Sequence, residues 1–221
     1  MNIPVNRYSL DALLERYKQL KPIADDLLAA EQLLIDCILE RKALLVAGNG
    51  GSCADAEHIV GELMKTFIER PAIDESVVLS LQTVDARIGR HLSECLETAI
   101  PAICLSSQTA LTTAFCNDVD PDDIYAQQVY GYRAISGLFW GLSTSGNARN
   151  VLHAAVTAKA LGLKVLGMTG MDGGELKSYC DVIIRVPEQE TFKIQELHLP
   201  VYHWLCARIE EYLFEPSNEK Q

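Results

Sequence analysis

The sequence lacks any apolar run close to the roughly 20 residues that a membrane-spanning helix requires. Its opening stretch, MNIPVNRYSLDALLERYKQL, also lacks the apolar core of a secretory signal. Basic residues are scarce, since 19 Lys and Arg stand against 30 Asp and Glu, and the formal net charge is −11. Such a surface repels a phosphate backbone, which disfavours nucleic acid as a partner. We therefore expect a cytoplasmic protein that binds neither nucleic acid nor membranes.

The cysteines lack a pairing pattern. There are seven of them, an odd number, and no two have CxxC spacing. Most lie in apolar runs, as small buried side chains do, which favours a reducing compartment over a disulfide framework. The sequence also has no internal repeat, no low-complexity segment, and neither the GxGxxG nor the GxxxxGK[ST] fingerprint.

Short apolar runs alternate with helical patterns along the chain. The runs that predict strands span 43–48, 76–81, 101–106, 138–143, 164–170 and 181–187. The predicted helices span 9–20, 22–41, 52–66, 87–100, 148–162 and 193–214, the last with a kink at Pro200. This alternation predicts one α/β domain over residues 1–221, with N-terminal helices at about 9–41, a parallel sheet within about 43–187 and a final helix at about 193–214.

A glycine-rich turn, GNGGS at residues 48–52, connects the first predicted strand to a helix. Glycines let the backbone approach a ligand closely, and free N–H groups at the start of a helix favour an anion. A tight strand-to-helix turn without any ligand explains the same letters equally well.

A second turn of this kind, STSGN at residues 143–147, places three hydroxyl side chains at the start of another helix. One such residue suffices to cap a helix, so three favour an anion site, which needs no Lys or Arg. Both turns follow strands of the predicted sheet, and ligands of α/β proteins bind at that edge.

Polar groups that could hold a metal or move a proton lie on two helices. Asp55, His58 and Glu62 share one face of the helix after the first turn, although a solvated helix face often has this composition. On the final helix, Gln195 and His203 lie roughly 80° apart around the axis and could converge on one pocket. We interpret His91, His153 and His198 as structural residues.

Together these segments resemble a known family. The segments AGNGGSCADAEHIVGEL, CNDVDPDDIYAQQV, GLSTSGNARNVLHAA, GMTGMDGGEL and KIQELHLPVYH resemble, in this order and over nearly the whole chain, the phosphoheptose isomerases, which are sugar-isomerase (SIS) domain enzymes. The resemblance implies a flavodoxin-like three-layer fold in a homotetramer with active sites between subunits. It also implies the conversion of sedoheptulose 7-phosphate to D-glycero-D-manno-heptose 7-phosphate through an enediol.

The resemblance also implies roles for individual residues. The sugar site would contain Asn49, Gly50, Gly51, Asn117, Asp118 and Gln195, and the phosphate site Ser143, Thr144 and Ser145. One zinc ion per subunit would be held by His58, Glu62, Gln195 and His203, with Glu62 and His203 as the acid–base pair. Such an exchange needs a base, an acid and a group that stabilises charge on oxygen, which these residues and a divalent cation supply. A carboxylate bound tightly to zinc is a poorer base, so the metal could serve mainly to organise the pocket.

The sequence departs from the family in several places. Residues 75–100 resemble an insertion, Ala148 replaces a serine, and Phe192 replaces an acidic residue three positions before Gln195. These departures leave the identity of the sugar open. The alternative function is a non-catalytic SIS module that binds a sugar phosphate as a sensor or scaffold. For assembly, the apolar faces of the N-terminal helices, with Leu27, Leu28, Leu33 and Leu34, predict a closed oligomer, and a tetramer above others.

Overall fold

A computed structural model describes residues 8–65, 67–68 and 70–214. Its centre is one five-stranded, entirely parallel sheet with strand order β2-β1-β3-β4-β5. The strands are β1 (Ala43–Ala47), β2 (Ala102–Cys104), β3 (Ser136–Leu142), β4 (Lys164–Thr169) and β5 (Val182–Arg185). This order is the flavodoxin-like one, in which a ligand site is expected where the strand order reverses beside β1 and β3.

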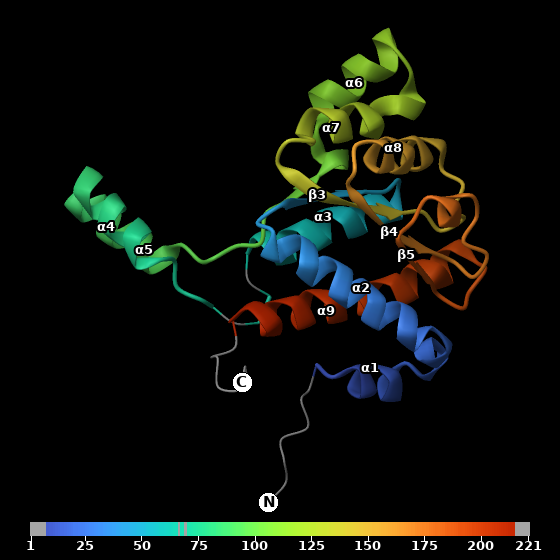
Figure 1. Cartoon of the computed structure of the whole chain (residues 1–221), viewed down its shortest axis with the longest axis horizontal. Helices are drawn as coiled ribbons and strands as arrows, with labels where there is room; N and C mark the ends of the chain where they lie inside the picture. Colours follow the sequence, from blue (N-terminus) through green and yellow to red (C-terminus); the bar gives the residue numbers. More distant parts are fainter. Residues whose placement is uncertain (1–7, 66, 69, 215–221) are drawn as a thin grey trace, which may run out of the picture.

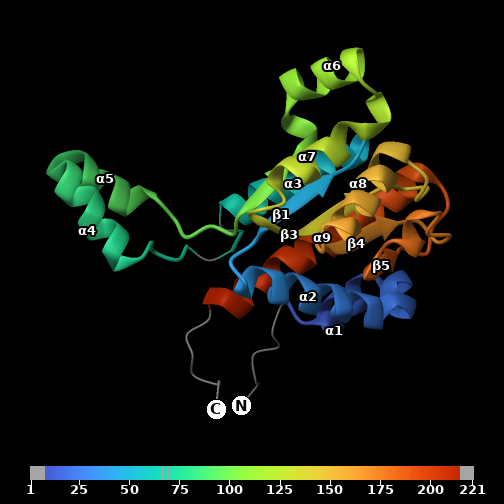
Figure 2. The ribbon, with the colours of Figure 1, turned by 45° about the horizontal axis from the view of Figure 1, so that its top comes forward.

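Helices cover both faces of the sheet, and this confirms the predicted three-layer α/β fold (Figures 1 and 2). One face packs against α2 (Ala24–Leu39), α3 (Gly51–Met64) and α9 (Thr191–Phe214). The other face packs against α7 (Ile124–Tyr132) and α8 (Arg149–Ala160). Every residue of β1 is buried, as expected for a central parallel strand covered on both sides.

The N-terminal helices are shorter than predicted. The first predicted helix divides into α1 (Leu10–Arg16) and the 3-10 helix η1 (Lys18–Ile23). Helix α2 has a strongly buried face, on which Leu27 and Leu34 are fully enclosed within this chain while Leu28 remains 47% exposed. Two of the four leucines that predicted an oligomer therefore belong to the core of the subunit.

The strand predicted at 76–81 is wrong, because this segment lies in helix α4 (Glu75–Val84). Helix α4 pairs with α5 (Ala86–Cys95) in a hairpin that projects away from the body (Figure 1). The run SVVLSL has strand-forming residues, but it packs on α5, where Gly89 lies so close to the Leu81 backbone that an added Cβ would be 2.4 Å from it. The predicted insertion therefore folds as a helical arm.

Two helices have no counterpart among the predictions. Helix α6 (Thr109–Asp118) has no buried residue and contains three threonines, which have low helix propensity, so its helical pattern is weak. Helix α7 packs on the sheet through residues such as Tyr125 and Val129. The remaining predicted strands and helices are confirmed, although α5 ends at Cys95 rather than near 100. Within the described ranges, no helix is both long enough and apolar enough to cross a membrane.

Candidate active site

The first glycine-rich turn follows β1 and begins helix α3. Gly50 has a φ of 57°, a backbone conformation that residues with a Cβ adopt rarely. Gly51 lies against the N-terminal part of α9, where an added Cβ would come within 2.4 Å of the Gln195 amide nitrogen. The backbone conformation therefore explains Gly50, and close packing explains Gly51. Because Gly51 has no Cβ, the side chain of Gln195 can lie at the start of α3.

The second turn, after β3, presents its hydroxyl groups beside the first residues of α8. Ser143 is buried, and its Oγ accepts a hydrogen bond from the Ala148 N–H at 3.4 Å. The Oγ of the exposed Ser145 accepts one from the Asn147 N–H at 3.1 Å. Gly146 has a φ of 67°, and a Cβ there would lie 2.1 Å from the Gly173 carbonyl oxygen. The sequence of this turn is thus fixed by its packing as well as by its polar groups.

The two turns line one cavity of about 280 Å³. The sequence favoured an anion site at the second turn and left the first turn open between an anion site and a plain connection, and the fold places both turns at the same edge of the sheet. The residues that line the cavity are Asn49, Gly50, Gly51, Ser52, Leu142, Ser143, Thr144, Ser145, Ala148, Thr191 and Gln195. Of these, Ser52, Leu142, Ala148 and Thr191 were not predicted as site residues, and all four lie close in sequence to predicted ones.

A larger groove of about 410 Å³ lies between α1 and α9, where it reaches one side of His203. Its lining includes Leu13, Phe67, Leu199 and Trp204, which are apolar. A phosphorylated sugar carries many hydroxyl groups and charge, so the smaller cavity between the polar turns suits it better.

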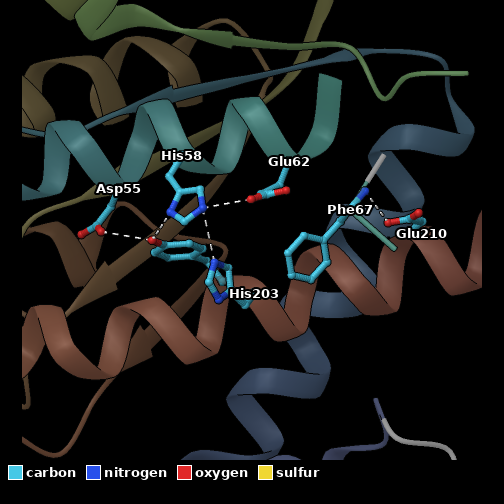
Figure 3. Close-up of polar contacts among 7 residues, drawn as sticks. Asp55, His58, Glu62, Phe67, His203 and Glu210 are labelled. Carbon is cyan, nitrogen blue, oxygen red and sulfur yellow. Dashed lines mark hydrogen bonds and ion pairs between the residues drawn. The ribbon is translucent and has the colours of Figure 1, made fainter. Parts of the chain in front are cut away.

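Three potential metal ligands lie close together between two helices. His58 and Glu62 extend from α3 and His203 extends from α9 (Figure 3). His58 Nε2 lies 2.9 Å from Glu62 Oε1 and 3.5 Å from His203 Nε2. One ligand atom from each of the three residues lies within 4.8 Å of the others. Donors of one zinc ion are up to about 4 Å apart because each bond is about 2 Å long, so a small contraction would suffice for them to share an ion.

The charge state of this group also suits a metal. Burial lowers the pKa of His203, His58 lowers it further, and Glu62 opposes both effects. His203 is therefore held towards the neutral form, which has the lone pair that a metal ligand or a base needs. Two imidazoles and a carboxylate are a frequent donor set for zinc.

Gln195, the fourth predicted ligand, lies apart from these three donors along the helix. Its amide is next to Gly51, seven residues before His58 on α3, and it lines the cavity between the turns. Its role as a zinc ligand stays a prediction, while its place in the cavity agrees with the predicted sugar-binding role.

A second layer of residues holds His58 and His203. The Tyr202 hydroxyl lies 2.9 Å from His58 Nδ1 and donates to Asp55 Oδ1 at 3.3 Å. Phe67 stacks on the His203 ring with centroids 5.3 Å apart. Asp55 belongs to the polar face that the sequence predicted. Tyr202 was not predicted, because a tyrosine within the apolar pattern of a helix indicates a core residue.

Asn49 is also held by residues that sequence reasoning missed. Its amide exchanges hydrogen bonds with that of Asn150 at 2.8 and 3.0 Å. Tyr125 donates to the Gly48 carbonyl at 2.7 Å and reaches Asn49 Oδ1 at 3.2 Å. Asn150 lies three residues after STSGN, so its position in a helix that begins at the turn was the available signal.

Asn117 and Asp118, predicted to bind the sugar, are the last two residues of α6, and neither lines the cavity. Their side chains bond to each other at 2.7 Å on an exposed surface. Their predicted role stays a prediction, and within one chain the helix that carries them projects from the body on the far side of α7 (Figure 2).

The remaining histidines take the places expected of structural residues. His198 is fully buried, with Nε2 at 3.3 Å from the Thr169 carbonyl oxygen. His153 pairs with Asp123 at 2.6 Å. His91 lies on the projecting α5. None of them belongs to the group formed by His58, Glu62 and His203.

The fold and these polar turns define a SIS-domain protein, and the SIS domain family matches residues 8–100 and 102–203. The phosphoheptose isomerase of Nitratiruptor sp. is 35% identical over 203 residues, which are 90% of this chain and 95% of that protein. The one from Shewanella baltica is 34% identical, over 90% of this chain and 89% of that protein.

Solved structures agree with this classification. The phosphoheptose isomerase of Neisseria gonorrhoeae superimposes with a TM-score of 0.70 at 26% identity, over 91% of this chain and 94% of that one. That of Francisella tularensis has a TM-score of 0.70 at 25% identity, over 94% and 96%. The chain belongs to the phosphoheptose isomerase family.

Proposed function

We propose that this protein is an aldose–ketose isomerase of a sugar phosphate, with sedoheptulose 7-phosphate as substrate and D-glycero-D-manno-heptose 7-phosphate as product. The observation that carries the proposal is the arrangement of α3 and α9. Gln195 lies beside Gly51 in the cavity between the turns, and His203 lies beside His58 further along both helices. The two helices therefore extend from the cavity between the turns, where a phosphate would bind, to His58, Glu62 and His203, which are able to transfer protons.

The phosphate belongs at the turn after β3. Ser143, Thr144 and Ser145 supply hydroxyl groups, and α8 begins there without a side-chain cap, which leaves N–H groups for an anion. Seven residues of helix separate Gly51 from His58, a rise of about 10 Å. An extended phosphosugar with its phosphate in this turn can direct its carbonyl end along α3 towards Glu62.

Glu62 and His203 supply the proton transfers. Isomerisation removes a proton from the carbon next to the carbonyl group and returns it to the neighbouring carbon, through an enediol. Glu62 is the base that takes and returns the carbon-bound proton, and His203, held towards neutrality by burial, exchanges protons with the sugar oxygens. The Glu62 side chain is one quarter exposed, so a substrate can reach it.

His58, Glu62 and His203 would hold one zinc ion per subunit, with Gln195 as a fourth ligand after a movement of its side chain. When bound, zinc supplies a positive charge beside the sugar oxygens on which negative charge develops. His58, 43% exposed, is placed to hold the ion at the open side of the group.

We place the active enzyme in the cytoplasm as a homotetramer with active sites between subunits. The exposed Leu28 on α2 and the apolar groove between α1 and α9 are surfaces that subunit contacts would cover. Asn117 and Asp118 are exposed at the end of α6, where they could reach the site of a neighbouring subunit.

A panel of C5 to C7 ketose phosphates, assayed with zinc present, tests the function. We expect turnover of sedoheptulose 7-phosphate and exchange of its carbon-bound proton with solvent deuterium. Binding of a sugar phosphate without either reaction would instead support the alternative function, a SIS module that acts as a sensor or scaffold.

A further inference from the structure

The hydroxyl group of Tyr202 connects two charged or polar groups of α3. It is part of a side chain that is only 1% exposed, and it contacts both Asp55 Oδ1 and His58 Nδ1. A tyrosine hydroxyl has a single proton to donate. Asp55 Oδ2 is buried without a hydrogen-bond partner among the described residues, so Oδ1 carries this carboxylate's contact with Tyr202.

Two arrangements of protons are compatible with these distances. In the first, Tyr202 donates to Asp55 and accepts from the His58 Nδ1–H, so Nε2 of His58 has a free lone pair. In the second, Tyr202 donates to Nδ1, and the Nε2–H of His58 points at Glu62. Asp55 favours the first arrangement and Glu62, 2.9 Å from Nε2, favours the second, because each carboxylate is an ionised acceptor that forms the stronger hydrogen bond. A cation bound to Nε2 excludes the second arrangement, because it takes the place of the Nε2–H.

We propose that Asp55 and Tyr202 are positioning residues that stabilise the Nδ1–H tautomer of His58 against the competing hydrogen bond from Nε2–H to Glu62, and so keep the Nε2 lone pair available for a cation shared with Glu62 and His203. A ring nitrogen hydrogen-bonded in this way prepares the other nitrogen for a metal. This inference rests on the proposed function, since it gives the tautomer its use. The proposed role of Tyr202 differs from a packing role, because it depends on the hydroxyl oxygen and not on the ring.

The variant Tyr202→Phe removes that oxygen and keeps the ring. Long-range proton–nitrogen NMR of the metal-free protein reports the tautomer of His58. We expect a larger share of the Nδ1–H form in the wild type than in the variant, in which only the hydrogen bond from Nε2–H to Glu62 remains. The matched control is Tyr179→Phe, since this partly buried tyrosine packs in the opposite core.

Zinc affinity is the second readout, measured by competition with a chelator. We expect Tyr202→Phe to bind zinc about ten- to a hundredfold more weakly, and Asp55→Asn to show a smaller loss. An unchanged tautomer in Tyr202→Phe would overturn the inference, and so would an unchanged zinc affinity. If the wild type binds no zinc, the proposed zinc site fails, while the NMR experiment still decides the role of Tyr202.

A different observation concerns the helical arm formed by α4 and α5. Its stems are joined by the ion pair between Arg70 and Glu97, at 2.7 Å, and by the Thr98 N–H bond to the Pro71 carbonyl. Beyond them, no residue of α4 and only Gly89 of α5 is buried. Helices of ten residues are marginally stable without packing, so the arm needs a partner surface.

The arm has one continuous apolar face. Val77, Leu81 and Val84 recur at helical spacing on α4, and Ile88 and Leu92 do so on α5. Together they line a shallow groove of about 240 Å³. Val84 at the tip is 89% exposed, which is far more than is usual for an apolar side chain that forms part of a contiguous apolar face on a monomeric protein.

The charges of the arm differ between its two ends. Arg87 and Arg90 are exposed near the tip, where Asp85 caps α5 and offsets one of their charges, while Asp74, Glu75 and Glu94 are exposed near the stem. An antiparallel pair of arms related by twofold symmetry would place each basic tip beside the acidic stem of the other. A parallel pair would place like charges together, which is unfavourable.

The geometry points to the same arm of a second copy of this chain as the partner, in an antiparallel four-helix contact. The apolar faces would cover each other, and the charge pattern would set their direction. This contact is separate from the N-terminal helices on which the predicted tetramer depends.

Disulfide cross-linking tests the direction. Cys95 lies at the stem, and Ile88→Cys would place a thiol on the same helix face nearer the tip, seven residues and about 10 Å of helix away, too far for a bond within one chain. In a Cys116→Ser background, we expect oxidised Ile88→Cys protein to form covalent dimers, in which the introduced thiol of one chain is bonded to Cys95 of the other. Protein with Cys95 alone should not form them.

Charge reversal supplies the matched control. Arg87→Glu with Arg90→Glu should reduce the cross-link at least several-fold, and adding Glu75→Lys with Glu94→Lys should restore it. Dimers through Cys95 alone would indicate a parallel contact and overturn the proposal. Absence of cross-links with every variant would overturn it as well, and would leave another protein as the partner of the arm.

Discussion

Glu62 has two proposed tasks, to hold a metal and to accept a proton from carbon. Glu62→Gln keeps the size of the side chain and one ligand oxygen, but it removes the base. General acid–base groups contribute about a hundredfold to ten-thousandfold, so we expect kcat to fall by that factor while the sugar phosphate still binds. Steady-state kinetics and calorimetric binding measure the two quantities. Near-normal turnover and deuterium exchange would restrict Glu62 to metal binding, with Asp55 and Asp118 the next candidates for the base.

Substitution of Ser143 and of Thr144 distinguishes binding of the phosphate from packing of the turn. A hydrogen bond to a charged group contributes about 1.5–3 kcal/mol, so Thr144→Ala should weaken binding about ten- to a hundredfold. Ser143→Ala should also lower stability, because the Ser143 hydroxyl accepts from the Ala148 N–H. Binding by calorimetry and thermal unfolding distinguish the two variants. Unaltered binding in both would move the phosphate to the turn around Gly50 and Gly51.

At the scale of elements, helix α3 carries both ends of the site. Gly51→Ala places a Cβ 2.4 Å from the Gln195 amide nitrogen, which is the far end of a flexible side chain. We expect Gln195 to be displaced, so that sugar binding weakens to the level of Gln195→Ala while the protein stays folded. Gly61→Ala on the same helix has no atom within 4 Å of the new Cβ and is the matched control. If Gly51→Ala binds like the control, Gln195 has no part in the site.

At the scale of the whole molecule, the buried His198 makes stability depend on pH. Burial lowers its pKa to about 4, from an ordinary value near 6.5. Between these values the unfolded chain binds the proton and the folded protein does not, so stability is present above about pH 6.5 and is lost as the pH falls towards 4. From pH 7 to pH 5 the loss is on the order of 2 kcal/mol from this residue.

Urea unfolding of the wild type and of His198→Gln at both pH values measures this loss, since the difference between the proteins removes the contribution of other groups. We expect the variant to lose less stability than the wild type on acidification. Equal losses would show that His198 is protonated as easily in the folded protein as in the unfolded chain.

Assembly is the second property of the whole molecule. A tetramer requires apolar surface beyond the core, and this chain exposes such surface on α2, in the groove between α1 and α9, and on the arm. Light scattering at micromolar concentration should give about four times the mass of one chain. A monomer there would contradict the predicted assembly and remove the need for sites between subunits.

Elements with a local pattern could be predicted from the order of residues. Continuous apolar runs such as 43–48 predict buried strands, and glycines and hydroxyl residues directly after strands predict polar turns at one edge of a parallel sheet. The pairing of His58 with Glu62 was available for the same reason, because residues four apart share a helix face.

Features that depend on packing between distant segments became visible only in the folded chain. SVVLSL has the residues of a strand, yet it forms a helix because its neighbour in space is α5 and not a sheet edge. The contact of His203 with His58 joins residues 145 positions apart, and the contact of Tyr202 with Asp55 joins residues 147 positions apart. No local pattern encodes how α3 and α9 lie against one face of the sheet, so the group of possible ligands and the tyrosine behind it emerge only when the chain is folded.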